Sequence, residues 1–198
     1  MFYRIMRWIV YPFIRLFLRF DIHGTENIPK DQGYILCANH VSMADMFALA
    51  VPFHSQIRYM AKGELFRFRP LGWFFSALGT FAVQRGQGDT GAIDKACEII
   101  EQGGVLGIFP EGTRSMGGEI GRAKSGAALI AIRTKAPMLP VSLRYSTGRA
   151  KPFCRVTVNI GSLIPYTEPE GQETQRGAIR RVSNQMMDEI KQLWEMKA

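Results

Sequence analysis

The strongest constraint on the fold comes from one histidine and one carboxylate that stand five positions apart, His40 and Asp45. Inside a single helix, at about 100° per residue, two side chains with this spacing point roughly 140° apart. They can face each other only where the chain changes structure between them. The sequence predicts such a change, because residues 34–37 form an apolar run that favours a short buried strand, and Ser42 is a good N-cap for a helix that continues to Val51. We therefore expect a strand-to-helix corner that brings the two side chains together.

Two interpretations of this corner are open. In the first, Asp45 fixes the tautomer of His40 and supports its imidazolium form, while the other ring nitrogen takes a proton from a substrate. In the second, Ser42 and Asp45 form a loose capping box at a positive helix end, and His40 is a structural residue near a strand terminus. The rest of the chain has to decide between general-base chemistry and capping.

Short apolar strands and amphipathic helices alternate along the chain. A short strand is expected from residue 21, with further strands at residues 57–60, 81–84, 105–109, 138–144 and 155–160. Helices are expected at residues 62–78, in two pieces around Pro70, and at residues 90–102, 124–134 and 173–196. This alternation favours an α/β fold in which helices flank a mixed or mostly parallel sheet. A length of 198 residues suits one such domain, which we place at residues 21–198.

Residues 1–20 differ from the rest, because nearly all of them are apolar or aromatic apart from four arginines. On a helical wheel the arginines share an arc of about 120° and leave a broad apolar remainder. This pattern is typical of a helix that lies in a membrane interface with its arginines toward lipid phosphates, although an amphipathic helix docked on the domain would give the same pattern. Pro12 is expected to kink the element or to open a second short helix. The four arginines are Arg4, Arg7, Arg15 and Arg19.

Composition narrows the classes of partner. A net charge of +8 indicates an anionic partner such as nucleic acid, an acidic membrane surface or an acidic protein. No helix-turn-helix, zinc-finger or RNA-recognition signature is present, so we expect no nucleic-acid partner. No apolar run approaches the roughly 20 residues that a membrane-spanning helix needs. The three cysteines have neither zinc-ligand nor disulfide-framework spacing, which favours buried thiols and a reducing compartment.

Charged residues follow two further predicted strands, at the positions where ligands bind in open α/β sheets. Arg85 follows one strand, and Glu111 and Arg114 stand on a glycine-containing turn after another. A base and two arginines on one rim suit a substrate with a hydroxyl to deprotonate and a phosphate to hold, because the planar guanidinium matches phosphate oxygens. Lys124 could add a further positive charge. Alternatively, Glu111 and Arg114 pair with each other, and the remaining cations are solvated.

Four blocks in this order resemble the 1-acylglycerol-3-phosphate O-acyltransferase (lysophosphatidic acid acyltransferase) family of glycerolipid acyltransferases. The resemblance covers about residues 20–165, and the chain is short for the family. The blocks are Asn39-His40-x4-Asp45, Gly79 to Arg85, Phe109-Pro-Glu-Gly-Thr-Arg-Ser115, and Ala136 to Val141.

The resemblance implies roles for the singled-out residues. His40 would deprotonate the free hydroxyl of a lysophospholipid, with Asp45 orienting and charge-balancing it, and the oxygen would attack the carbonyl of an acyl thioester. The acceptor's glycerol phosphate would be held by the Pro-Glu-Gly-Thr-Arg block, with Arg85 and Lys124 helping. The expected substrate-binding residues are thus Arg85, Glu111, Gly112, Thr113, Arg114 and Lys124.

By the same resemblance, the product would be phosphatidic acid for phospholipid biosynthesis. The donor would be acyl-CoA or acyl-carrier protein, and no metal or other cofactor is implied. We expect a peripheral, monotopic protein on the cytoplasmic face of the cell membrane, in contact with anionic lipid. Two alternatives stay open: an acyltransferase for glycerol 3-phosphate or another lysophospholipid, and a non-catalytic basic membrane-binding protein.

Overall fold

The computed structural model describes residues 2–83, 90–115, 120–169, 171 and 173–196 of the chain. Seven strands form one sheet in the order β1-β7-β6-β2-β5-β3-β4. Every neighbouring pair is parallel except β6 and β7, so the expected mixed, mostly parallel sheet is confirmed. The strands are β1 (Arg19–His23), β2 (Tyr34–Ala38), β3 (Ile57–Lys62), β4 (Phe81–Val83), β5 (Val105–Ile108), β6 (Met138–Tyr145) and β7 (Arg155–Ile160).

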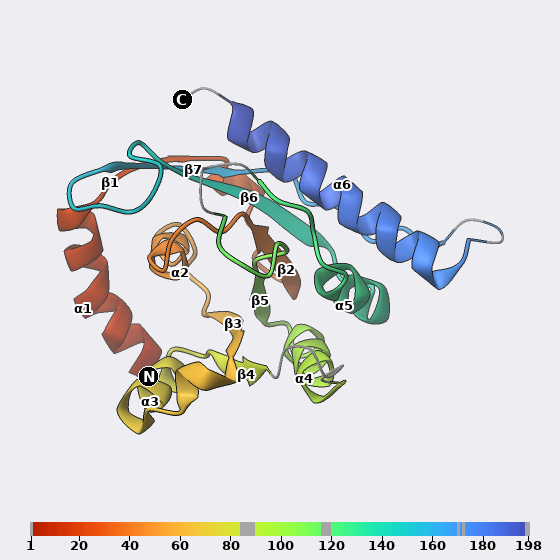
Figure 1. Ribbon diagram of the computed structural model, residues 1–198, viewed down its shortest axis with the longest axis horizontal. Helices are drawn as coiled ribbons and strands as arrows, with labels where there is room; N and C mark the ends of the chain where they lie inside the picture. Colours follow the sequence, from red (N-terminus) through yellow and green to blue (C-terminus); the bar gives the residue numbers. More distant parts are fainter. Residues whose placement is uncertain (1, 84–89, 116–119, 170, 172, 197–198) are drawn as a thin grey trace.

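Helices cover both faces of this sheet (Figure 1). One face packs against α4, α5 and α6, and the other packs against α2 and the segment that contains Phe53. The helices are α1 (Phe2–Phe17), α2 (Asp45–Leu49), α3 (Arg69–Ala77), α4 (Thr90–Glu101), α5 (Gly126–Thr134) and α6 (Gln175–Glu195), with 3₁₀ turns η1 (Thr25–Asn27) and η2 (Gly63–Phe66).

The central strand β2 shows why the sheet is covered on both sides. Its side chains alternate between the faces, with Ile35 and Cys37 in the core under α4–α6 and Leu36 in the core on the α2 side. All five residues of β2 are buried, as expected for a parallel strand between two helical layers. Burial also raises the pKa of the Cys37 thiol, and all three cysteines are buried and free, as the sequence predicted.

The N-terminal helix departs from its predicted form. It runs as one element through Pro12 and ends at Phe17, three residues before the predicted end of the N-terminal element. Arg19 therefore begins β1 instead of sharing a helical arc with the other arginines, because its backbone N–H donates to Cys154 O and its strand pairs with β7. Among the described helices, none is both long and apolar enough to cross a bilayer.

Two other predicted helices begin too early. Lys62 is the last residue of β3, so the first of the two predicted helical pieces is present only as the 3₁₀ turn η2, and the second piece, α3, begins at Arg69. Ser42 is not the N-cap of α2, which begins at Asp45 after Ala44. The Ser42 hydroxyl accepts the N–H of Ala44 at 3.2 Å and so closes a turn ahead of the helix.

The turn after β1 provides a test of the packing against β7. Gly24 and Gly103 both have left-handed backbones, with φ of 78° and 76°, but a Cβ at Gly24 would lie 2.0 Å from Ile160 O, whereas one at Gly103 would meet nothing within 4 Å. We expect Gly103→Ala to lower the free energy of unfolding by about 1 kcal/mol and Gly24→Ala by about 3 kcal/mol or more, because only the second adds a clash to the strain. Chemical denaturation of both variants measures the difference. Equal losses would show that the β1 turn moves away from β7 without cost.

Candidate active site

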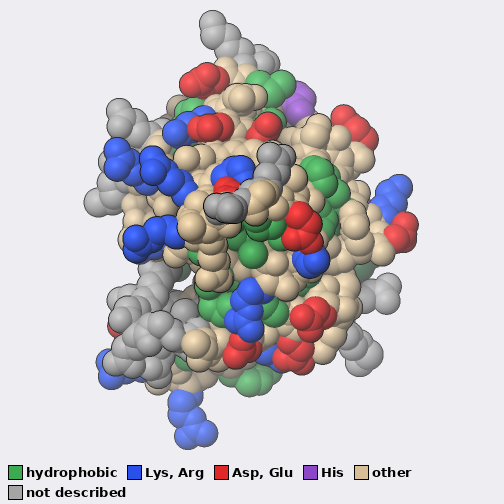
Figure 2. Space-filling view, turned by 90° about the vertical axis from the view of Figure 1, so that its right-hand side faces the viewer, with side chains coloured by type: hydrophobic (Ala, Val, Ile, Leu, Met, Phe, Trp, Pro, Cys, Tyr) green, Lys and Arg blue, Asp and Glu red, His purple; other side chains and the backbone are tan. Residues whose placement is uncertain are grey.

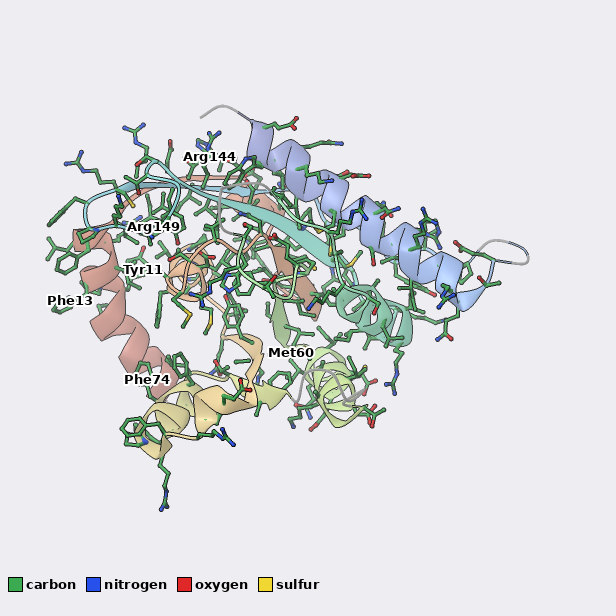
Figure 3. All side chains as sticks on the ribbon, viewed as in Figure 1. Tyr11, Phe13, Met60, Phe74, Arg144 and Arg149 are labelled. Carbon is green, nitrogen blue, oxygen red and sulfur yellow. The ribbon has the colours of Figure 1, made fainter. Side chains whose placement is uncertain are left out.

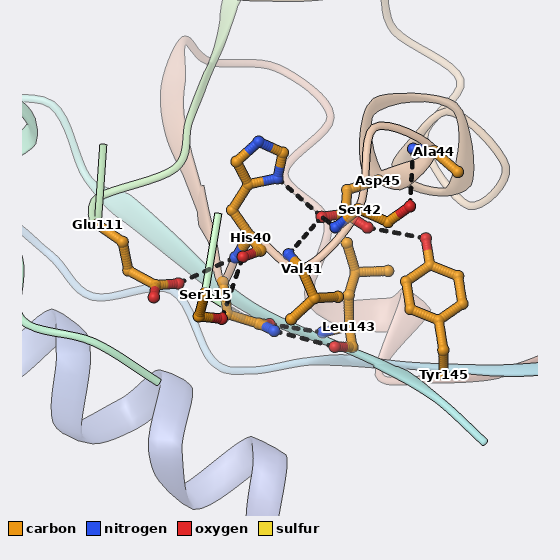
Figure 4. A network of polar contacts seen from close by, with 10 residues as sticks. His40, Val41, Ser42, Ala44, Asp45, Glu111, Ser115, Leu143 and Tyr145 are labelled. Atoms are coloured by element: carbon orange, nitrogen blue, oxygen red, sulfur yellow. Dashed lines mark hydrogen bonds and ion pairs between the residues drawn. The ribbon is translucent and has the colours of Figure 1, made fainter. Parts of the chain in front are cut away.

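His40 and Asp45 meet at the corner between β2 and α2. His40 Nδ1 lies 2.8 Å from Asp45 Oδ2 (Figure 4). The Asp45 side chain is completely buried, whereas that of His40 is 17% exposed. The parallel strands β2, β5 and β6 all end at this edge of the sheet, which is where ligands bind in open α/β folds. The strand-to-helix corner that the five-residue spacing predicted is therefore present.

Asp45 is a buried carboxylate that accepts hydrogen bonds at both of its oxygens. Besides His40, its Oδ2 accepts the backbone N–H groups of Val41 at 2.7 Å and Ser42 at 2.8 Å. Its Oδ1 accepts the Tyr145 hydroxyl at 2.8 Å. A buried charge needs such compensation, since leaving it unpaired would be very costly. Burial, followed by the adjacent Asp45 charge, raises the pKa of Tyr145 far above its usual value, so the phenol stays a protonated donor.

These contacts set the tautomer of the His40 ring. A carboxylate can only accept, so Nδ1 carries the ring proton of the neutral imidazole and Nε2 keeps its lone pair. The ring stacks on Phe109 with centroids 4.0 Å apart and planes at 16°, and Phe109 in turn stacks on Tyr59 at 5.8 Å. His40 is thus held in one orientation with an unprotonated nitrogen available as a base.

The loop after β5 holds the backbone of His40. Glu111 Oε1 accepts the His40 N–H at 3.0 Å, and the Ser115 N–H donates to His40 O at 2.8 Å. The other Glu111 oxygen accepts the N–H of Gly121 at 2.9 Å. Glu111 is buried, and these two backbone contacts occupy both of its oxygens. The geometry therefore gives Glu111 the support of His40, whereas the sequence placed it on the acceptor phosphate.

Asn39 fixes the same corner from the opposite side. Its side-chain amide donates to Leu143 O at 2.9 Å, and its carbonyl oxygen accepts the Leu143 N–H at 2.7 Å. The fully buried amide thus imitates a strand and extends the β2–β6 pairing by one step past Ala38. The sheet therefore fixes the position of the adjacent His40.

A cavity of about 550 Å³ opens beside His40. Part of its wall is polar and cationic, with Thr113, Arg114 and Lys124. Neither cation forms an ion pair with a carboxylate among the described side chains. The remaining wall is mostly apolar and comes chiefly from α2, β3, β5, Phe109 and α5: Met43, Met46, Tyr59, Met60, Ala61, Ile108, Phe109, Ala127 and Ile130.

The glycine of this loop suits a left-handed backbone, and the Lys124 side chain lies against it. Gly112 has φ of 70°, and a Cβ there would lie 2.7 Å from Lys124 Cδ. The lysine stem therefore crosses the loop backbone, and both residues line the cavity. The structure thus brings five predicted residues to one place: His40, Gly112, Thr113, Arg114 and Lys124. Arg85 lies outside the described residues.

Sequence reasoning missed four members of the site: Asn39, Phe109, Ser115 and Tyr145. Asn39, Phe109 and Ser115 stand inside the sequence blocks that resemble the family. Their packing and backbone contacts leave no separate signal in the sequence. Tyr145 could have been found, because a polar residue at the carboxyl end of a buried strand belongs to the ligand edge of a parallel sheet. The predicted strand stopped at Arg144, one residue too soon.

The chain is similar to known acyltransferases. A sequence model of the family described as Acyltransferase matches residues 19–144. The 1-acyl-sn-glycerol-3-phosphate acyltransferase of Bacillus subtilis is 35% identical over 61% of this chain and 60% of its own length. That of Streptococcus pneumoniae is 31% identical over 86% of this chain and 67% of its own length. The crystal structure of the 1-acyl-sn-glycerophosphate (LPA) acyltransferase PlsC from Thermotoga maritima superposes with a TM-score of 0.66 at 28% identity, covering 92% of this chain and 76% of that one.

Several curated relatives are much longer than the matched region. The chain spans 39% to 60% of the lengths of three of them.

The role of Glu111 can be tested by stability. In Glu111→Gln, a side-chain NH₂ would face one of the two backbone N–H donors, and we expect the free energy of unfolding to fall by about 2 kcal/mol. The exposed Glu168, which pairs with Lys135 on the surface, is the matched control, and Glu168→Gln should cause no measurable loss. Denaturant titration measures both. If Glu111→Gln were as stable as the control, Glu111 would not be the support of His40.

Proposed function

The chain belongs to the Acyltransferase family, and on that premise we propose that it transfers a fatty acyl group from an acyl thioester to the free sn-2 hydroxyl of 1-acylglycerol 3-phosphate. The product would be phosphatidic acid. The observation that carries the proposal is the buried His40–Asp45 pair beside a cavity with both a cationic and an apolar wall. The choice of acceptor is supported by the Bacillus and Streptococcus relatives, both of which are named as 1-acyl-sn-glycerol-3-phosphate acyltransferases.

The proton transfer follows from the geometry of the pair. Nε2 of His40 takes the proton from the acceptor hydroxyl while the oxygen attacks the thioester carbonyl. Asp45 stabilises the imidazolium that forms, and the Tyr145 hydroxyl and two N–H groups hold that carboxylate in place. The attack forms the new C–O ester bond. The C–S bond breaks as the tetrahedral intermediate collapses. The leaving thiolate then takes the proton back from His40.

The cavity wall suits an amphipathic acceptor. Arg114 and Lys124 are cations without a described carboxylate partner, so they are available to a phosphate. The α5 N-terminus adds partial positive charge beside them, because Gly126 and Ala127 also line the cavity. The apolar residues of β3, β5 and α5 suit hydrocarbon chains. Acyl-CoA and acyl-carrier protein both present the thioester that the proposed reaction requires.

We also propose that the protein acts as a peripheral protein on the cytoplasmic membrane face. The support comes from α1, which exposes Trp8, Phe13 and Leu16 to solvent. Both acceptor and product reside in the bilayer, and aromatic side chains favour its interface.

The function is tested by acyl transfer to lysophosphatidic acid with purified protein, offered either acyl-CoA or acyl-carrier protein. We expect His40→Ala to lower kcat by about 10³-fold or more, because general-base catalysis is lost while the fold and membrane association remain. His23→Ala is the matched control, since His23 is an exposed histidine on β1 that pairs with Asp21. Glycerol 3-phosphate and other lysophospholipids are run as competing acceptors. Absence of turnover with every lysophospholipid would refute the proposal, and turnover in His40→Ala equal to that of His23→Ala would refute the mechanism.

Arg114 tests how the acceptor is held. Arg114→Ala should raise KM for lysophosphatidic acid by about 10- to 100-fold with a smaller change in kcat, because it removes a charge-assisted phosphate contact. Arg122→Ala removes an exposed arginine near the same loop and should leave both constants unchanged. A change confined to KM for the acyl donor would assign Arg114 to the donor site instead.

A further inference from the structure

Three exposed phenylalanine rings from distant parts of the sequence form one row. Phe13 and Phe17 belong to α1, and Phe153 belongs to the segment between β6 and β7, residues 146–154, here called the 146–154 loop. The centroids are 6.2 Å apart from Phe13 to Phe17 and 5.7 Å apart from Phe17 to Phe153. The rings are nevertheless 63%, 42% and 62% exposed. Contiguous apolar surface of this kind marks an interaction site.

The loop and the helix are joined by their backbones. The N–H of Phe153 donates to Phe17 O, and the N–H of Arg19 donates to Cys154 O. Figure 1 shows the 146–154 loop beside the carboxyl end of α1, and Figure 3 labels Phe13 and Arg149 at this end of the molecule. The row of rings is therefore one surface built from both elements.

The backbone of Phe153 is unfavourable for its side chain. Its φ is 64°, in the left-handed region that bulky residues rarely occupy, at a cost of about 1 kcal/mol or more. Burial does not offset this cost, since most of the ring faces solvent. The folded chain thus presents an aromatic ring outward, in a conformation that a Gly or Asn would adopt more easily.

Exposed cations lie close in sequence to the three rings, on the end of α1, in the 146–154 loop and at the starts of β1 and β7. None of them forms an ion pair with a carboxylate among the described side chains. They are Arg15, Arg19, Arg149, Lys151 and Arg155.

The face that carries α4, α5 and α6 has a different charge pattern. Acidic and basic side chains are mixed on it (Figure 2). Many of its cations have partners: Arg133–Asp94 at 2.9 Å, Lys95–Glu98 at 2.6 Å and Arg181–Glu173 at 3.0 Å. Several cations of that face are thus neutralised by carboxylates, whereas, among the described side chains, the cations near the exposed rings are not.

We propose that the 146–154 loop is a second membrane contact, continuous with α1, in which Phe153 enters the interface of an anionic bilayer while Arg149 and Lys151 bind lipid phosphates. Protruding rings flanked by long cations are the composition that membrane interfaces select. This inference rests on the proposed function for its reason, because acceptor and product reside in the bilayer. It adds a contact that is remote in sequence from the N-terminal helix.

The test is partitioning of the full chain onto lipid vesicles. Phe153→Asn removes the ring and suits the left-handed backbone, so the fold should be kept. Arg149→Gln/Lys151→Gln removes two charges. On vesicles of phosphatidylcholine with about 30% phosphatidylglycerol at about 0.1 M salt, we expect the partition coefficient to fall by about fivefold for the first variant and about tenfold for the second. On pure phosphatidylcholine only the first variant should show a loss.

Matched variants outside the row of rings and the 146–154 loop serve as controls. Met196→Asn removes an exposed apolar side chain next to α6, and Arg176→Gln/Arg180→Gln removes two exposed charges from α6. Both should partition as wild type does.

Activity with a short-chain, monomeric acceptor separates the two proposals. If the loop acts on the membrane alone, both loop variants keep wild-type kcat and KM in this assay. Partition coefficients within twofold of wild type for both loop variants would overturn the inference. Unchanged partitioning with a raised KM for acyl-carrier protein would also overturn it and assign the surface to that acidic donor. A wild-type protein that acylates no acceptor would instead defeat the proposed function and leave the partition result standing.

Discussion

The burial of the Asp45 carboxylate is the interaction on which the rest of the site depends. An ionised group with no exposed surface is tolerated only when its surroundings donate to it. Here the donors come from the chain between β2 and α2, from the His40 ring and from the far end of β6. No lysine or arginine among the described residues pairs with Asp45, which leaves the His40 imidazole as its ionisable partner. The sheet supplies the rigidity, because Asn39 ties the same corner to β6.

The loop after β5 couples this base to the rest of the cavity. Glu111 and Ser115 hold the backbone of His40, whereas Thr113 and Arg114, between them in sequence, line the cavity. The loop thus supports His40 through Glu111 and Ser115 and lines the cavity with the residues between them. A displacement of the loop would therefore move His40 together with this part of the cavity wall.

Sequence patterns predicted the features that depend on residues close together in the chain. The five-residue spacing between His40 and Asp45 required a corner, and the apolar run of β2 placed it. Pairing between distant strands could not be read in the same way. Nothing near Arg19 indicates that β7 will recruit it into the sheet, and nothing near Asp45 indicates that β6 will bring Tyr145 to its carboxylate. The family resemblance assigned Glu111 to the acceptor together with the rest of its block, and only the fold shows its side chain turned toward the His40 backbone.

The single antiparallel pair in the sheet links the site to the proposed membrane surface. Parallel neighbours need a crossover of a dozen or more residues, whereas the antiparallel β6 and β7 are joined by the short 146–154 loop. Tyr145 ends β6 in contact with Asp45, and the next residue begins that loop. The end of β6 therefore contacts the Asp45 carboxylate, and the loop that follows it carries the exposed Phe153 ring. A bilayer that holds Phe153 would therefore hold the cavity at a set height above the lipid, because the loop that carries the ring directly follows Tyr145, which contacts Asp45.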